Sequence, residues 1–351
     1  MTRSLSPKPL ASLPRDGAFA APAREVLEPR SRLLRFVAIG SCLPYLGLKI
    51  AWIAGSRIGI PDGSFLLKHR TEMVVTNGLT VLMDGAVIVL ALVLTRPWGR
   101  RVPAWLLAFP VWVATGLLAP IMAGFPLQLL IRALGGSGGR SGGDGGHEKF
   151  LDAWVFGVVY TGFIVQGLAL GALFVLYARD RWSHLWQGRV RELPAGTIGA
   201  AQRACAVAAA VIALFPIVAH LFWAFGGTSG LSAKRVADRG GDFYALEALD
   251  VVFLLAAVGG ACLLAFRRSG TLPVKLPLAL VWVGSGAQAC WSAWLSLATL
   301  TQTDDLGDRT TQLMNLTYAG QMITGMLVAA LGVHFLAERS ASARTAKQPS
   351  T

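Results

Sequence analysis

The chain has 351 residues, of which 54% are hydrophobic and only 15% are charged, and its mean hydropathy is +0.55. A soluble domain carries roughly 25% charged residues, so this composition excludes an ordinary soluble enzyme and an intrinsically disordered chain. It indicates a multi-pass membrane protein. The net charge of +13 does not indicate nucleic-acid binding, because no signature interleaves aromatic with basic residues. In a membrane protein, such an excess marks the cytoplasmic side.

Eight apolar stretches are each long enough to cross a bilayer, which takes roughly 20 residues. They are 36–54, 75–95, 104–124, 153–176, 204–224, 245–265, 276–300 and 313–336. Backbone polar groups must be satisfied internally in lipid, so these spans are predicted to be helices. Pro120 and Pro126 are expected to end the third span and to leave an interfacial segment up to Leu130.

The distribution of Lys and Arg fixes the predicted orientation. With the N-terminus inside, the cytoplasmic segments hold 21 basic residues and the outer loops hold 10. This two-to-one bias predicts that both termini are cytoplasmic. Residues 1–33 are polar and rich in Pro and Arg, without the apolar run of a cleavable signal peptide. They are predicted to form a disordered cytoplasmic tail.

Three sequence patterns recur in the second half of the chain, in the same order and at the equivalent spans. The first, Lys49-x-x-Trp52-x-x-Gly55-x-x-x-Gly59, recurs 171 residues later as His220-x-x-Trp223-x-x-Gly226-x-x-x-Gly230. The others are Pro103 with Val111-Trp112-Val113, repeated at Pro273 and Val281-Trp282-Val283, and Tyr160-x-Gly162-x-x-x-x-Gly167, repeated at Tyr318-x-Gly320-x-x-x-x-Gly325. Composition bias can produce one such match, but three in order predict an internal duplication.

The duplication divides the chain into two units of four spans. The predicted boundaries are 34–182 for the first unit, 183–203 for a cytoplasmic linker, 204–338 for the second unit and 339–351 for a cytoplasmic tail. An even number of spans makes both units enter the membrane in the same direction, as in transporters with parallel repeats. The expected fold is therefore an all-α membrane protein of eight transmembrane helices, arranged as two parallel four-helix repeats.

Only four charged residues lie inside the predicted spans: Lys49, Asp84, Glu247 and Asp250. An unpaired charge at mid-bilayer costs roughly 2.5–3.5 kcal/mol, so such residues usually pair or line water. Side chains lean toward the N-terminus of their helix, which lets Lys49 and Asp84 meet at similar depth. In the second half His220 takes the place of Lys49. Asp250 takes roughly that of Asp84 with a four-residue gap, and Glu247 shares its helix face.

These residues admit two interpretations. In the functional one, Lys49 with Asp84 and His220 with Glu247 and Asp250 form related sites on the pathway of a small solute or a proton, and His220 relays protons near neutral pH. In the structural one, which we favour for Lys49, Asp84 and Glu247, the lysine reaches outward, Asp84 is a pairing partner, and the two acids cap a helix start.

Trp52 and Trp223 admit a similar choice. Either residue could cover a ligand by stacking or by cation–π contact. A tryptophan at this position more often fills a helix interface or an interfacial belt, and that interpretation is favoured here.

The loop after the seventh span contains Asp304, Asp305 and Asp308, which have the DDxxD spacing of Mg²⁺-dependent prenyl-diphosphate enzymes. Clustered carboxylates can hold Mg²⁺ against phosphates. The predicted topology places this loop outside, whereas isoprenyl diphosphates are made in the cytoplasm, and short matches arise often by chance. A solvated acidic loop is therefore the favoured interpretation, and no cofactor is indicated.

The segment Leu43-Pro44-Tyr45-Leu46-Gly47-Leu48-Lys49-Ile50-Ala51-Trp52, with the later Arg100-Arg101-Val102-Pro103-Ala104-Trp105-Leu106, resembles a group of uncharacterised multi-pass integral membrane proteins of actinobacteria. The resemblance covers most of the chain after residue 33. It implies a bacterial plasma membrane as the location and carries no activity or site residue.

The leading functional hypothesis is a transporter or permease-like protein with a polar site between the two repeats. A membrane enzyme acting on a lipid or isoprenoid, and a non-catalytic membrane partner or sensor, remain alternatives. The sequence contains no catalytic pattern that would favour the enzyme.

Overall fold

The computed structural model describes residues 29–62, 64–136, 151–193, 199–266, 271–300 and 309–345. Within these ranges all regular secondary structure is helical. The first half contains α1 (Pro29–Gly40), α2 (Leu43–Ile53), α3 (Phe65–Lys68), α4 (Arg70–Thr95), η1 (Pro97–Arg101), α5 (Ala104–Ala133) and α6 (Ala153–Trp186). The second half contains η3 (Val190–Glu192), α7 (Gly199–Ala224), α8 (Ala233–Ala237), α9 (Gly241–Phe266), α10 (Lys275–Gly286), η4 (Ala287–Trp291), α11 (Ser292–Leu300) and α12 (Gln312–Thr345).

In the described part of the chain, seven helical segments are long and apolar enough to cross a membrane. They correspond to seven of the eight predicted spans, and they indicate a multi-pass membrane protein. The remaining predicted span, 276–300, is occupied by α10, η4 and α11 in direct succession. The middle piece, η4, is a π-helical segment, which divides this run into shorter helices.

The helix does not break at Pro120 or Pro126, where the third span is predicted to end. Helix α5 continues through both prolines and ends at Ala133. A proline removes one backbone N–H donor, but an apolar helix in lipid gains nothing by unwinding, because the freed groups find no water. Neighbouring helices and local adjustments can instead satisfy the backbone, so these prolines do not end the helix.

The first predicted span, 36–54, is one apolar stretch but two helices. A turn at Ser41 and Cys42 separates α1 from α2, and Pro44 is the second residue of α2. The side chains of Ser41 and Cys42 both donate hydrogen bonds to the carbonyl oxygen of Ala38, at 3.1 Å. These bonds satisfy a carbonyl at the end of α1, where proline interrupts the regular helical pattern.

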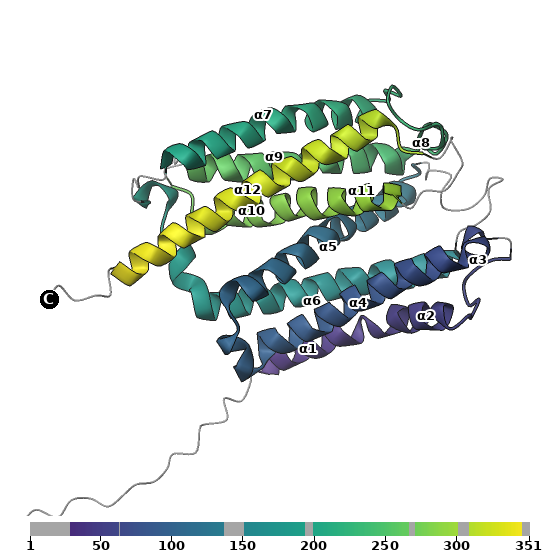
Figure 1. Cartoon of the computed structure of the whole chain (residues 1–351), viewed down its shortest axis with the longest axis horizontal. Helices are drawn as coiled ribbons and strands as arrows, with labels where there is room; N and C mark the ends of the chain where they lie inside the picture. Colours follow the sequence, from purple (N-terminus) through teal and green to yellow (C-terminus); the bar gives the residue numbers. More distant parts are fainter. Residues whose placement is uncertain are drawn as a thin grey trace, which may run out of the picture.

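The long helices lie side by side, and α5 crosses obliquely between two groups (Figure 1). One group contains α1, α2, α4 and α6, and the other contains α7, α9, α10, α11 and α12. Helix α1 begins and α12 ends at the same end of the bundle, on the left of Figure 1, whereas α3 and α8 lie at the opposite end. The two clusters of buried charge described below lie nearer the α3–α8 end.

The recurring tryptophan–glycine pattern has the same local structure in both halves. The indole of Trp52 donates to the carbonyl oxygen of Ile58 at 2.7 Å, and that of Trp223 donates to the carbonyl oxygen of Ser229 at 3.1 Å. Four glycines of the two patterns have positive φ: Gly55 (100°), Gly59 (73°), Gly226 (94°) and Gly230 (82°). Because L-residues rarely adopt this conformation, the glycines are needed for these loop turns.

The two halves meet through a reciprocal contact between α5 and α10. The indole of Trp112 donates to Ser285 Oγ at 3.0 Å, and the indole of Trp282 donates to Thr115 Oγ1 at 3.3 Å. Trp112 and Trp282 are 170 residues apart, as are Thr115 and Ser285. Each bond is therefore the counterpart of the other, with donor and acceptor exchanged between the halves.

Gly116 and Gly286 lie at the centre of this contact and are also 170 residues apart. A Cβ atom added to Gly116 would lie 2.3 Å from the carbonyl oxygen of Gly286, closer than any real contact. The two backbones thus touch, as small residues allow in membrane helix pairs.

Replacing Gly116 by alanine should therefore separate α5 from α10 and destabilise the protein by about 1–3 kcal/mol, the usual cost of overpacking. Thermal unfolding of the purified protein in detergent measures this effect. The matched control is Gly85→Ala on α4, where an added Cβ meets no atom within 4 Å; it should leave the melting temperature unchanged or raise it slightly. Equal melting temperatures for the two variants would contradict the close approach.

Candidate functional site

The first cluster of buried polar side chains consists of Tyr45, Lys49, Asp84 and Gln166, all at least nine-tenths buried. Lys49 Nζ lies 3.0 Å from Asp84 Oδ2, so the expected pair is present. The Tyr45 hydroxyl lies 3.3 Å from Asp84 Oδ1 and also contacts the side-chain oxygen of Gln166. A hydroxyl has one proton, so it donates to one acceptor and can accept from a reoriented Gln166 amide.

The Lys49 ammonium group is enclosed by aromatic rings as well as by its carboxylate. It lies 4.9 Å from the centroid of the Tyr45 ring and 5.5 Å from that of Phe163. Both distances are within the range of a cation–π interaction. The lysine therefore points into the bundle instead of reaching outward, and the first cluster has one positive and one negative charge.

The second cluster contains more polar groups, contributed by six segments. Its members are His220 of α7, Arg235 of α8, Glu247 and Asp250 of α9, Gln288 of η4, Ser292 of α11 and Gln321 of α12. His220 Nδ1 lies 2.5 Å from Glu247 Oε2, and Arg235 Nη1 lies 3.3 Å from Glu247 Oε1. Glu247 thus bridges a buried imidazole and an arginine.

His220 is bonded to one of the two carboxylates that the sequence placed with it. The alignment placed Asp250 at the position of Asp84, but the side chain bonded to His220 is Glu247. Glu247 is only 3% exposed and makes these two contacts from the second turn of α9, so it does not cap the helix.

Asp250 belongs to a second layer of the same cluster. Gln321 Nε2 donates to Asp250 Oδ1 at 3.5 Å, and Ser292 Oγ donates to Gln321 Oε1 at 3.3 Å. Gln288 Nε2 donates to the backbone carbonyl oxygen of Asp250 at 3.4 Å. Gln288 lies in η4, and π-helical segments within longer helical runs are frequent at functional sites.

Three buried polar atoms in this region have no hydrogen-bond partner among the described residues: His220 Nε2, Gln288 Oε1 and Thr324 Oγ1. Asp250 interacts electrostatically with His220 and lies in the same layer as Gln321. An unpaired buried polar atom is costly, and in native proteins it calls for an explanation such as a bound group or a functional role. The second cluster therefore has unused hydrogen-bonding capacity.

The corresponding positions in the first half are apolar. At the offsets of the sequence repeat, Gln288 corresponds to Leu118, Ser292 to Met122 and Gln321 to Phe163. The extended polar layer is thus a property of the second half alone. Among the described residues, the first cluster consists of the compact ion pair with its tyrosine and glutamine.

The other candidate residues are placed as follows. Trp52 and Trp223 are buried, and their indole N–H groups are bonded to loop carbonyls, so these donors hold the loops in place. The Trp223 ring also packs edge-on against His220, with centroids 5.4 Å apart. Asp304, Asp305 and Asp308 lie outside the described residues. Within the described ranges, no group of three or more His, Cys, Asp or Glu side chains is arranged to hold a metal ion.

Sequence reasoning missed several members of the clusters. Gln166, Gln288 and Gln321 are uncharged polar residues within apolar spans, and that placement is a signal that could have identified them. Arg235 lies between two predicted spans with other basic residues, and nothing in the sequence distinguishes it from them.

No protein-family model, curated protein or solved structure matches the chain. The argument for function therefore rests on the geometry of the two clusters.

Replacing Lys49 by methionine should destabilise the protein by about 3–5 kcal/mol, because Asp84 would remain as an unpaired buried charge. The double variant Lys49→Met/Asp84→Leu should recover most of that loss, since it removes both charges together. Melting temperatures of the wild type and of the single and double variants measure both effects. If the double variant melts as low as the single one, the pair does not carry the stability of this cluster.

Proposed function

We propose that the protein is a permease-like membrane protein of eight spans, formed by two parallel four-helix units. It lies in a bacterial plasma membrane, and both of its termini are on the cytoplasmic side. The matching tryptophan–glycine loops and the reciprocal α5–α10 contact support the duplication. The run α10–η4–α11 supplies the eighth span. The 21 basic residues on the side of the termini, against 10 on the other side, support the orientation.

We further propose that the second cluster is the working site and that it binds a proton. The observation that carries this proposal is the buried His220 imidazole, which is bonded to Glu247 through Nδ1. Its Nε2 makes no hydrogen bond of normal geometry within the described part of the chain, and the side chain of Gln321 also interacts with the ring. With a neutral imidazole, the two carboxylates and Arg235 leave one negative charge in the cluster. A protonated imidazole makes the cluster neutral. Uncompensated charge is costly in the membrane, and so the site favours proton uptake.

Charged and titratable side chains surround His220, and they come from the helices that pack against this residue. Glu247 and Asp250 come from α9, Arg235 comes from α8, and Tyr318 of α12 interacts electrostatically with all three. In this arrangement Glu247 holds the imidazole in place, and Asp250 supplies the negative charge that protonation of His220 balances. Gln321 and Ser292 orient the Asp250 carboxylate.

Arg235 supports access from the end of the bundle opposite the termini. Its side chain is 40% exposed, while the Glu247 side chain that it contacts is only 4% exposed. The arginine therefore spans from water to the buried pair. In the proposed orientation this end faces the outside of the cell.

The proposed site lies inside the second unit and not between the two units. The contact between the units at α5 and α10 is closed by two indole bonds and by touching glycine backbones. That tight contact also favours a second candidate function, a non-catalytic membrane partner in which the buried charges serve stability alone. The two functions differ in whether His220 exchanges protons.

Replacing His220 by lysine separates these two functions. The first cluster shows that this framework accommodates a lysine–carboxylate pair at the corresponding position, so the variant should fold. A lysine paired with Glu247 keeps its charge, whereas an imidazole titrates between pH 5 and 8. We expect ¹⁵N-histidine NMR of the protein in nanodiscs to show one ring, absent from His220→Lys, that changes between its neutral and charged forms over this range.

The matched control is Lys49→Arg, which changes the cation of the first cluster and should leave that NMR transition in place. In proteoliposomes with an enclosed pH-sensitive dye, the wild type should take up protons after an external acid pulse faster than His220→Lys. A His220 ring that keeps one form from pH 5 to 8 would overturn the proton site. Equal proton uptake by the wild type and His220→Lys would refute the role of His220 in transport.

A further inference from the structure

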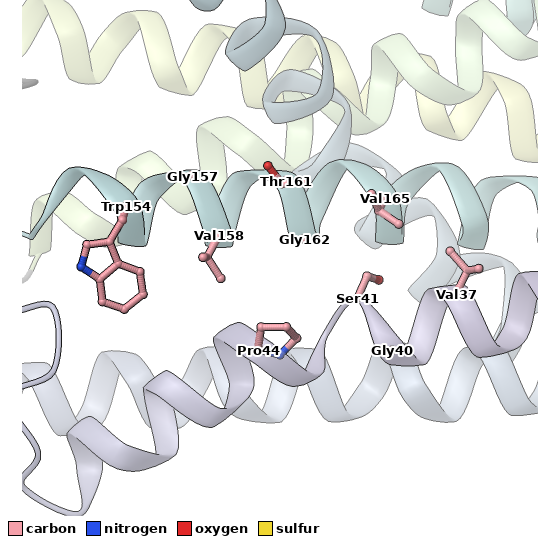
Figure 2. A pocket seen from close by; sticks show the side chains of 10 residues that line it. All are labelled: Val37, Gly40, Ser41, Pro44, Trp154, Gly157, Val158, Thr161, Gly162 and Val165. Carbon is pink, nitrogen blue, oxygen red and sulfur yellow. The ribbon is translucent and has the colours of Figure 1, made fainter.

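A groove of about 670 Å³ lies between the α1–α2 segment and α6, and its lining includes no member of either polar cluster (Figure 2). Trp154, Val158 and Val165 project from α6 toward α1 and α2, and Val37, Ser41 and Pro44 face them from the other side (Figure 2). The remaining lining residues are Gly40, Gly157, Thr161 and Gly162.

The groove exists because the helix breaks and because small residues line it. The turn between α1 and α2 falls at Ser41, in the middle of the lining. Added Cβ atoms at Gly40 and at Gly157 would meet no atom within 4 Å, so the space next to both glycines is open. At Gly162, by contrast, an added Cβ would lie 2.7 Å from the Tyr45 ring, which closes the floor of the groove.

The chemistry and position of the groove indicate its ligand. Its lining is mainly apolar, and the Ser41 hydroxyl is already bonded to a backbone carbonyl within α1. The groove lies on two segments that are apolar enough to span the membrane, and its exposed residues include Trp154 (49%), Val37 and Val165 (36% each). The outward-facing surface of a membrane-spanning segment is covered by lipid and not by water. Its volume is within the 300–1,000 Å³ of small-molecule sites.

We propose that this groove is a binding site for one acyl chain of a bilayer phospholipid, held between the α1–α2 break and the glycine-containing face of α6. Binding here differs from ordinary lipid contact because the chain lies in a recess with walls on both sides. The bound acyl chain packs against the floor of the groove. Tyr45 lies at this floor, and its hydroxyl contacts Asp84 and Gln166 on the inner side. Occupancy of the groove therefore stabilises the first unit.

The second half provides an internal comparison. At the repeat offsets, Gly40 corresponds to Val211, Ser41 to Ile212 and Gly157 to Asn315. A hollow of about 570 Å³ there is lined by six residues of α7 (Arg203, Ala204, Val207, Ala208, Val211 and Ile212) and by none of α12. The hollow of the second half thus has its wall on one helix, whereas the groove of the first half has walls on two segments.

Native mass spectrometry of the full chain, purified in mild detergent with added phosphatidylglycerol, tests this site. The wild type should retain one phospholipid molecule per chain. The variant Gly40→Val/Ser41→Ile, which inserts the side chains of the second half, should reduce this retained fraction by about tenfold or more, equivalent to at least 1.4 kcal/mol of binding free energy. Gly85→Val is the control, because it adds a valine side chain to open space on α4, outside the groove, and it should retain lipid as the wild type does.

A second variant fills the groove from its other wall, so that the test does not depend on one substitution. Gly157→Leu on α6 should also displace the lipid, and circular dichroism establishes that each variant is folded. Independently, a phospholipid with brominated chains should quench tryptophan fluorescence less in Trp154→Phe than in the wild type. Wild-type retention in both groove variants, loss in the Gly85→Val control, no retained lipid in the wild type, or retention of an isoprenoid instead of a phospholipid would each overturn the proposal.

Discussion

The low dielectric of the bundle interior is the constraint on which the rest of the structure depends. Each buried charge must have a partner within reach, because water is not available to solvate it. Lys49 meets this requirement with one carboxylate and two aromatic rings. Glu247 meets it with an imidazole and an arginine. The two solutions differ in one respect: a lysine–aspartate pair is neutral in a single state, whereas a histidine-containing cluster has two states of different charge.

The hydropathy pattern predicted the class of fold because apolar length is almost sufficient to define a membrane helix. It placed the helices well but missed two features that depend on local hydrogen bonding. The break at Ser41 and Cys42 depends on side chains that bond Ala38, and the continuation of α5 through Pro120 depends on packing by its neighbours. Neither effect is contained in an average over apolar residues.

The candidate site was predictable in part. The direction in which side chains lean on a helix correctly paired Lys49 with Asp84. In the second half the same reasoning placed both Glu247 and Asp250 with His220. It set Asp250 at the position of Asp84 across an alignment gap, and it did not show which carboxylate bonds the imidazole. Arg235 was not predictable at all, since its contact with Glu247 depends on how the short helix α8 folds back over the end of the bundle.

The exchange of donors between Trp112 and Trp282 has the geometry of an isologous interface, in which one surface binds a copy of itself. Such a surface joins two separate four-helix chains as readily as two halves of one chain. Covalent linkage replaces an encounter in the membrane by a high effective concentration. In separate identical chains, a substitution would appear on both sides of the interface. Under the proposed duplication, fusion of the two units removes that restriction, so one half can keep a fixed ion pair while the other acquires a layer of glutamines around an imidazole.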